Sequence, residues 1–107
     1  LAELTQRGEG VYQKNCVACH QMNGEGLPPI FPALAGSDIV MFDKGRNVEI
    51  LMEGVQGAAM QSFANQLSEV DMAAVITYTR QAWGNAENGD GEYVVPSDIV
   101  EYKKPKI

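Results

Sequence analysis

Hydrophobic and polar residues alternate with a helical period at the start of the chain. One face of a helix over residues 4–15 carries Leu4, Gly8, Val11 and Tyr12, at intervals of three and four residues. Gly8 is unfavourable there, because glycine in a helix interior costs about 1 kcal/mol relative to alanine. We therefore expect Gly8 to lie where another backbone or ring approaches this helix closely.

A second amphipathic helix is predicted from Ser68 to about Trp83. Ser68 is a good N-cap, and Asp71 three residues later completes a variant of the capping box. Gly84 is expected to stop the helix. Its apolar positions recur at helical spacing, at Val70, Ala74, Thr77 and Tyr78.

The sequence between these helices contains little regular structure. Prolines and glycines interrupt residues 21–46, where residues 37–42 are expected to add one short helical turn. Asn47 is predicted to cap a short helix over residues 48–53, which Gly54 ends. Residues 85–95 are mostly polar, and the final lysines are expected to form a loose end. No strand pair is visible, so we predict an all-α fold.

Composition and charge narrow the classes of partner. The 107 residues fit one compact domain, and 45% hydrophobic content is ordinary for a globular protein. A formal net charge of −6 argues against nucleic acid. It suits an electropositive partner, or serves solubility alone. No apolar run reaches the roughly 18–20 residues of a membrane span, and residues 1–7 lack the apolar core of a signal peptide.

Cys16-Val17-Ala18-Cys19-His20 is a C-x-x-C-H motif, the attachment signature of c-type haem. Two thiols on one helical turn can form thioether bonds to the two vinyl groups of one porphyrin. The adjacent His20 then faces the iron as its proximal ligand. The motif predicts one haem c, covalently bound through Cys16 and Cys19.

Other uses of the two cysteines fit less well. Zinc requires four ligands, and the chain has no third cysteine and no second histidine. A thioredoxin-like dithiol follows a strand, whereas residues 16–20 are predicted to be helical. A disulfide between cysteines three apart closes too small a loop to stabilise much.

The sixth ligand of the iron decides between functions. An open position means gas binding or catalysis, whereas a methionine means electron transfer and raises the reduction potential. We expect Met60, in a loop of small residues, with Phe63 covering the haem edge. Met41 is the rival. The other methionines fit worse, since Met22 is too near His20 in sequence and Met52 and Met72 suit helix packing.

From about Gly8 to Trp83 the chain resembles the class I cytochrome c family. Gly8 and Tyr12 precede Cys16 by eight and four residues, as in that family, and Val75 and Tyr78 match their partners on the last helix. The resemblance implies three to five helices wrapped around a covalently attached haem, with the N- and C-terminal helices crossing. It also implies that the Pro32 carbonyl accepts a hydrogen bond from His20, with Pro28 and Pro29 as rivals, and that Leu34 packs on the haem.

A narrower resemblance points to a larger assembly. Residues 19–37, 60–68 and 73–85 are similar to the haem domain fused to bacterial cytochrome c oxidase subunit II. This implies an excised, monomeric C-terminal domain, with a core at about 4–84 and an extension at 85–107. It also implies a periplasmic location, with the membrane anchor and copper domain of the parent subunit preceding this domain. The expected role is a relay, not an enzyme by itself, from a small redox donor protein to the oxidase copper domain.

Three other functions stay open. The first is a free-standing, diffusible periplasmic cytochrome c, which would use the same site residues. The second is a cytochrome domain of a dehydrogenase complex. The third, a haem peroxidase or gas sensor, would need Met60 displaced and a distal acid–base residue, although the single histidine is already used.

Overall fold

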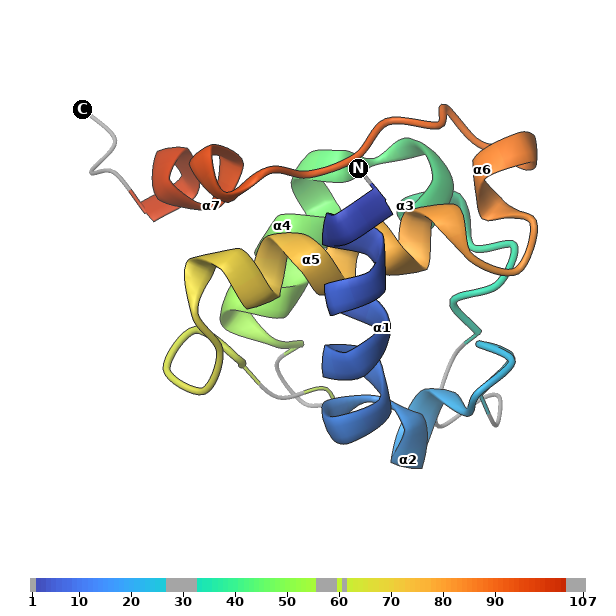
Figure 1. The fold of residues 1–107 in the computed structure, drawn as a ribbon, viewed down its shortest axis with the longest axis horizontal. Coiled ribbons are helices and arrows are strands. Elements are labelled where there is room, and N and C mark those ends of the chain that lie inside the picture. The colour runs from blue at the N-terminus through green and yellow to red at the C-terminus, as the bar shows by residue number, and fades with distance from the viewer. Residues whose placement is uncertain (1, 27–32, 56–59, 61, 104–107) are drawn as a thin grey trace.

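The computed structural model of the chain describes residues 2–26, 33–55, 60 and 62–103. Every regular element in these ranges is a helix, which confirms the all-α prediction. None of the described helices is long and apolar enough to cross a membrane. The elements, labelled in Figure 1, are α1 (Ala2–Asn15), α2 (Val17–His20), α3 (Asp38–Phe42), α4 (Lys44–Glu53), α5 (Glu69–Gln81), α6 (Asn85–Asn88) and α7 (Pro96–Lys103).

The crossing of α1 over α5 is the main helix–helix contact, and Figure 1 shows α1 running across α5. Gly8 lies at the crossing point. A Cβ atom at Gly8 would lie 1.9 Å from the carbonyl oxygen of Ala74 and 2.7 Å from Cβ of Tyr78. The expectation of a close approach at Gly8 is therefore confirmed, and the two helix axes are as near as they are because this position lacks a side chain.

The central helix, α5, begins as predicted but ends earlier. The Asp71 amide donates to the Ser68 hydroxyl at 3.1 Å, which confirms the N-cap. The helix stops at Gln81 and not at Trp83, because Ala82 is already extended (φ −78°, ψ 164°) and Trp83 has a left-handed φ of 56°. Val70, predicted on the apolar face, is 40% exposed, whereas the residues from Met72 to Thr77 are buried on all sides.

The predicted start of α4 is wrong by several residues. Asp43, and not Asn47, caps this helix, since its carboxylate accepts the Arg46 amide at 3.0 Å. The Asn47 side chain instead donates to the carbonyls of Ile39 and Val40 in α3. The short turn before it is confirmed as α3, and Gly54 ends α4 with φ 73° as predicted.

Residues 85–103 pack onto the core, and the sequence analysis missed both of their helices. Val94 and Ile99 are fully buried, and the Val94 amide and carbonyl both bond the Thr77 hydroxyl, at 2.9 and 2.8 Å. Helix α7 begins at Pro96, a position where proline is favoured because its missing N–H is not needed. Figure 1 shows this segment running along α5.

A buried guanidinium ties three elements together. Arg80 on α5 is 2% exposed. Its nitrogens donate to the carbonyls of Val40 at 2.9 Å and Glu92 at 2.8 Å, and to the carboxylate of Asp90. Arg80 thus joins α5 to α3 and to the chain that leads toward α7.

Candidate functional site

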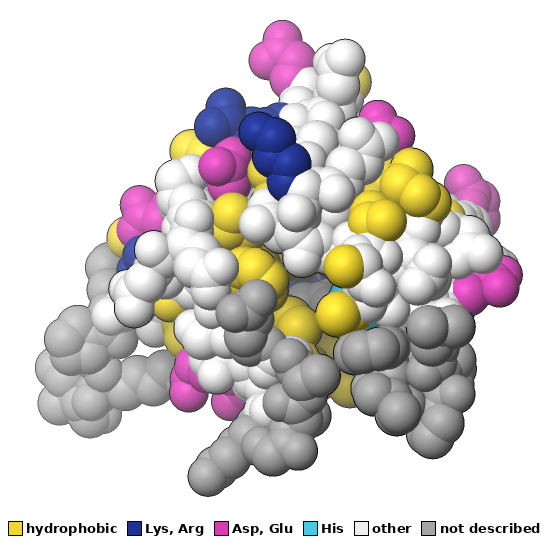
Figure 2. Space-filling model, turned by 90° about the horizontal axis from the view of Figure 1, so that it is seen from below, with side chains coloured by type: hydrophobic (Ala, Val, Ile, Leu, Met, Phe, Trp, Pro, Cys, Tyr) yellow, Lys and Arg dark blue, Asp and Glu magenta, His cyan; other side chains and the backbone are white. Residues whose placement is uncertain are grey.

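A cavity of about 330 Å³ opens among α1, α2, α3, α4 and α5. This volume is at the lower end of the range for small-molecule and cofactor sites, roughly 300–1,000 Å³. Figure 2 views the molecule from below Figure 1 and shows a hollow bordered by hydrophobic side chains. The apolar part of the wall includes Ile39, Val40, Ile50, Leu51, Val75 and Ile76.

The C-x-x-C-H motif forms one wall of this cavity, and Cys16, Cys19 and His20 all line it. The chain turns from α1 into α2 at Cys16, whose amide donates to the Tyr12 carbonyl at 2.9 Å. The His20 amide donates to the Cys16 carbonyl at 2.9 Å, so the predicted helical turn is confirmed. Burial, with a smaller contribution from Cys19, raises the pKa of the Cys16 thiol to about 11, which keeps it protonated at neutral pH.

Met60 lines the same cavity. All five methionines lie in the part of the chain that the structure describes, and none of the other four lines it. Met41 is buried in α3 but lies off the cavity wall, and Met22 is 54% exposed. The Met60 carbonyl accepts the Val55 amide at 3.0 Å, which ties this segment to the end of α4. Phe63 also lines the cavity and is 4% exposed.

Leu34 lines the cavity, and its packing on the haem stays a prediction. Asn85, which was not predicted from the sequence, holds the Leu34 backbone in place. The side-chain amide nitrogen of Asn85 donates to the Leu34 carbonyl at 3.1 Å and to the Thr79 carbonyl at 2.8 Å. The side-chain oxygen of Asn85 accepts the backbone amide of Gly36 at 2.8 Å. Pro32 and its rivals Pro28 and Pro29 lie outside the described residues, so the carbonyl partner of His20 stays a prediction.

The donor set fits haem and not zinc. The described residues contain no group of three or more histidine, cysteine, aspartate or glutamate side chains that could hold a metal ion. The cavity instead combines two thiols, one imidazole and one thioether with apolar walls. These are the groups that a covalently bound, axially ligated haem requires.

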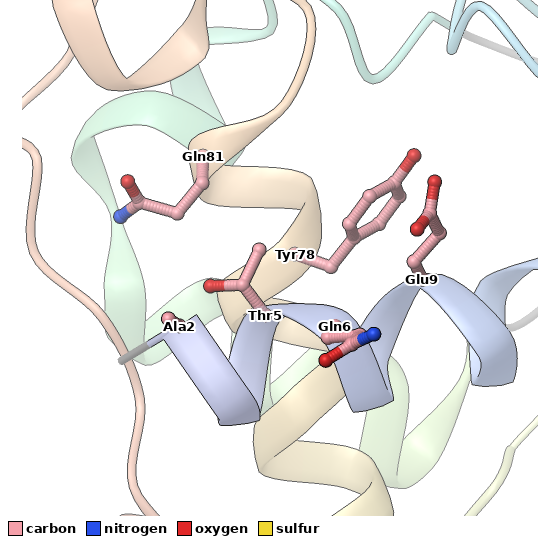
Figure 3. A pocket seen from close by; sticks show the side chains of 6 residues that line it. All are labelled: Ala2, Thr5, Gln6, Glu9, Tyr78 and Gln81. Carbon is pink, nitrogen blue, oxygen red and sulfur yellow. The ribbon is translucent and has the colours of Figure 1, made fainter.

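A larger hollow, of about 640 Å³, lies outside the crossing of α1 and α5 and carries none of these groups (Figure 3). Most of its described lining residues carry a polar group, although the surface exposed between these groups is mainly apolar. Burial together with Glu9 raises the pKa of Tyr78. Because none of the described residues that line the larger hollow is a cysteine, histidine or methionine, the smaller cavity is the candidate cofactor site. The lining residues of the larger one are Ala2, Thr5, Gln6, Glu9, Tyr78 and Gln81.

The known proteins that resemble this chain are described as cytochromes c or as cytochrome subunits of larger enzymes. Residues 3–78 match the family model described as cytochrome C oxidase, cbb3-type, subunit III. Cytochrome c-552 of Thermus thermophilus is 37% identical over 97% of this chain and 77% of its own length. The cytochrome c subunit of a quinone alcohol dehydrogenase of Gluconobacter oxydans is 34% identical over 95% of this chain but only 24% of its own length.

The family match includes the C-x-x-C-H motif and the crossing of α1 and α5. Proteins of this kind carry covalently attached haem c and transfer electrons, without being enzymes by themselves. Since the match extends over most of the sequence, this chain belongs to the cytochrome c family.

Proposed function

We propose that this protein carries one electron at a time on a haem c whose iron is held between His20 and Met60. The observation that carries the proposal is the position of Met60. Among the described residues, it is the one methionine on the wall of the cavity that Cys16, Cys19 and His20 also line. When bound, haem c supplies an iron that changes between the ferric and ferrous states.

The chain's own residues would hold the cofactor and limit its chemistry. Cys16 and Cys19 would fix the porphyrin through thioether bonds. His20 and Met60 would fill both axial positions in both oxidation states, which leaves no open site for catalysis. Leu34 and Phe63 would keep water from the haem faces, and the carbonyl of Pro32 would orient the His20 ring.

Optical spectroscopy tests the proposed ligands. The ferric protein should show the weak far-red band of an iron–methionine sulfur bond, and carbon monoxide should leave the ferrous spectrum unchanged. Ready binding of carbon monoxide, with no such band, would mean that Met60 does not hold the iron. The gas-sensor and peroxidase functions would then have to be reconsidered.

Met60→His should retain haem but lower the reduction potential, because imidazole favours the ferrous state less than a thioether does. The measurement is a spectroelectrochemical titration of both proteins. Met41→Leu is the matched control, since Met41 is buried but lies off the cavity wall. An unchanged potential in Met60→His, or a changed one in Met41→Leu, would contradict the assignment of Met60.

The electron's destination is a separate proposal with two candidates. Resemblance over residues 19–37, 60–68 and 73–85 supports delivery to the copper domain of an oxidase subunit II. The match to cytochrome c-552 over most of both chains supports a free-standing carrier. In either case we propose a single monomeric domain that acts in the periplasm. Residues 4–84 would form the cytochrome unit and residues 85–107 an extension, of which Val94 and Ile99 pack into the core.

Stopped-flow mixing with a purified oxidase copper domain distinguishes the two destinations. A relay within the oxidase predicts fast reduction of copper by the ferrous protein, at a rate that saturates as a docked complex forms. A free-standing carrier with other partners predicts slow transfer that rises linearly with concentration.

A further inference from the structure

The residue directly after His20 has an unusual backbone conformation. Gln21 has φ 67° and ψ 163°, a region that is essentially restricted to glycine. A residue with a side chain keeps such a conformation only where the surrounding structure holds it. The turn is closed by the Gly26 amide, which donates to the His20 carbonyl at 3.0 Å.

Two aromatic side chains hold this turn from the crossing of α1 and α5. The Tyr12 hydroxyl donates to the Gln21 carbonyl at 2.6 Å, and the Trp83 indole N–H donates to the Met22 carbonyl at 3.0 Å. The two rings contact each other edge to face, with centroids 5.3 Å apart. We call Tyr12 and Trp83 the aromatic clamp.

The clamp itself depends on a second unusual backbone position. Among the described non-glycine residues, only Gln21 and Trp83 have a positive φ. Trp83 uses its left-handed conformation to turn the chain at the end of α5. Gly24 leaves room for the indole, since a Cβ atom there would lie 2.6 Å from Cε3 of Trp83. The two residues with an unfavourable backbone conformation, Gln21 and Trp83, therefore both take part in the hydrogen bonds between the clamp and the turn. Gln21 accepts from Tyr12, and Trp83 donates to Met22.

We propose that Tyr12 and Trp83 are positioning residues that hold the strained turn at Gln21 and thereby fix how His20 enters the haem cavity. His20 is the last residue of α2, so relaxation at Gln21 would rotate its backbone and move its ring. This inference deepens the proposed function and rests on His20 being an iron ligand. Hydrogen-bonding partners of a ligating histidine fix the orientation of its ring. The aromatic clamp would fix the backbone of His20 in a similar way.

A double-mutant cycle on the holoprotein tests the hold on Gln21. Tyr12→Phe should lower the folding equilibrium constant roughly five- to tenfold, as expected for one lost hydrogen bond. In Gln21→Gly, which adopts the turn without strain, the turn should stay in place, and the same change should have a clearly larger effect, because no release of strain offsets the lost hydrogen bond. Tyr78→Phe is the control, because Tyr78 contacts the same rings but bonds neither carbonyl of the turn. Equal effects of Tyr12→Phe in both backgrounds would overturn the proposal.

Electron paramagnetic resonance of the ferric protein tests the effect on His20, since the signal depends on how the axial ligands are oriented. Tyr12→Phe and Trp83→Phe should broaden or shift the signal, and adding Gln21→Gly to Tyr12→Phe should restore it. Lower stability with an unchanged signal would show a packing role only, and would overturn the proposal. If Trp83→Phe does not fold, Tyr12→Phe carries the test.

The two proposals can fail separately. A wild-type spectrum without histidine–methionine ligation would overturn the proposed function. The stability cycle would still report whether Tyr12 holds Gln21, because that measurement does not depend on the identity of the sixth ligand.

Discussion

At the scale of single residues, Gly8 shows packing overriding helix propensity. Glycine weakens α1, yet the carbonyl of Ala74 occupies the space that a side chain would need. Gly10, two residues further along the same helix, has no atom within 4 Å of a Cβ built on it. The same residue type is thus required at one position and replaceable at the other.

Gly8→Ala should therefore lower the free energy of unfolding by about 1–3 kcal/mol, the usual effect of overpacking, because the crossing must open to admit the methyl group. Gly10→Ala should raise it by up to about 1 kcal/mol through helix propensity alone. Denaturant titration of both variants measures the difference. Equal effects at the two positions would show that the close contact at Gly8 does not limit stability.

At the scale of elements, local signals were sufficient for α1, for α3 and for the start of α5. The haem motif, the N-cap Ser68 and the glycine at the crossing are each recognised within a few residues. The start of α4 was wrong because Asp43 and Asn47 are both good caps, and only the contact of Asn47 with α3 decides between them. Met60 was predicted from its loop, and the cavity supports that choice over Met41.

Contacts between distant residues could not be predicted in the same way. Asn85 bonds Leu34, 51 positions away, and Arg80 bonds Val40, 40 positions away. Neither residue stands out in the sequence, because an asparagine after a glycine and an arginine near a helix end usually face solvent. Helix α7 was missed although Pro96-Ser97-Asp98 is a typical helix start.

The link between Arg80 and Asp90 gives the chain beyond α5 a dependence on pH. Desolvation acts to raise the pKa of Asp90, but hydrogen bonds from Arg80 and from the Glu92 amide, with the charges of Arg80 and Lys44, outweigh it. The pKa therefore lies below its usual 3.8. A carboxyl group whose pKa is lowered by folding stabilises the fold fully above its unfolded value and loses that contribution as pH falls through its folded value.

Asp90→Asn should accordingly reduce stability at pH 7, and the variant's stability should fall less steeply than the wild type's below pH 3.8. Denaturant titrations across this range compare the two proteins. Glu87→Gln, at an exposed position on α6, is the control. Parallel pH profiles for wild type and Asp90→Asn would show that the ion pair does not contribute.

At the scale of the whole molecule, negative charge dominates. The formal net charge is −6. Within the described residues, five basic side chains pair with acidic ones: Arg7, Lys44, Arg46, Arg80 and Lys103. Little positive charge therefore remains to balance the field that an approaching partner meets. Such a field speeds encounters with cations and slows those with anions.

Electron exchange with small inorganic reagents should show this effect directly. The rate with a cationic metal complex should fall as ionic strength rises, and the rate with an anionic complex should rise, since salt screens both interactions. Stopped-flow measurements over a range of salt concentrations provide the test. Matching trends for the two reagents would mean that local charges near the cavity, and not the net charge, govern the approach.

The crossing of α1 and α5 also closes the intervening chain into one large loop. Most of the described residues that line the cavity, from Cys16 to Phe63, are carried on this loop. Because the entropy of closing a loop rises only slowly with its length, inserted residues would add little to the cost of folding. A chain built this way can lengthen the segments around its cofactor and so reshape the surface that a partner meets. The two helices that close the loop would stay unchanged.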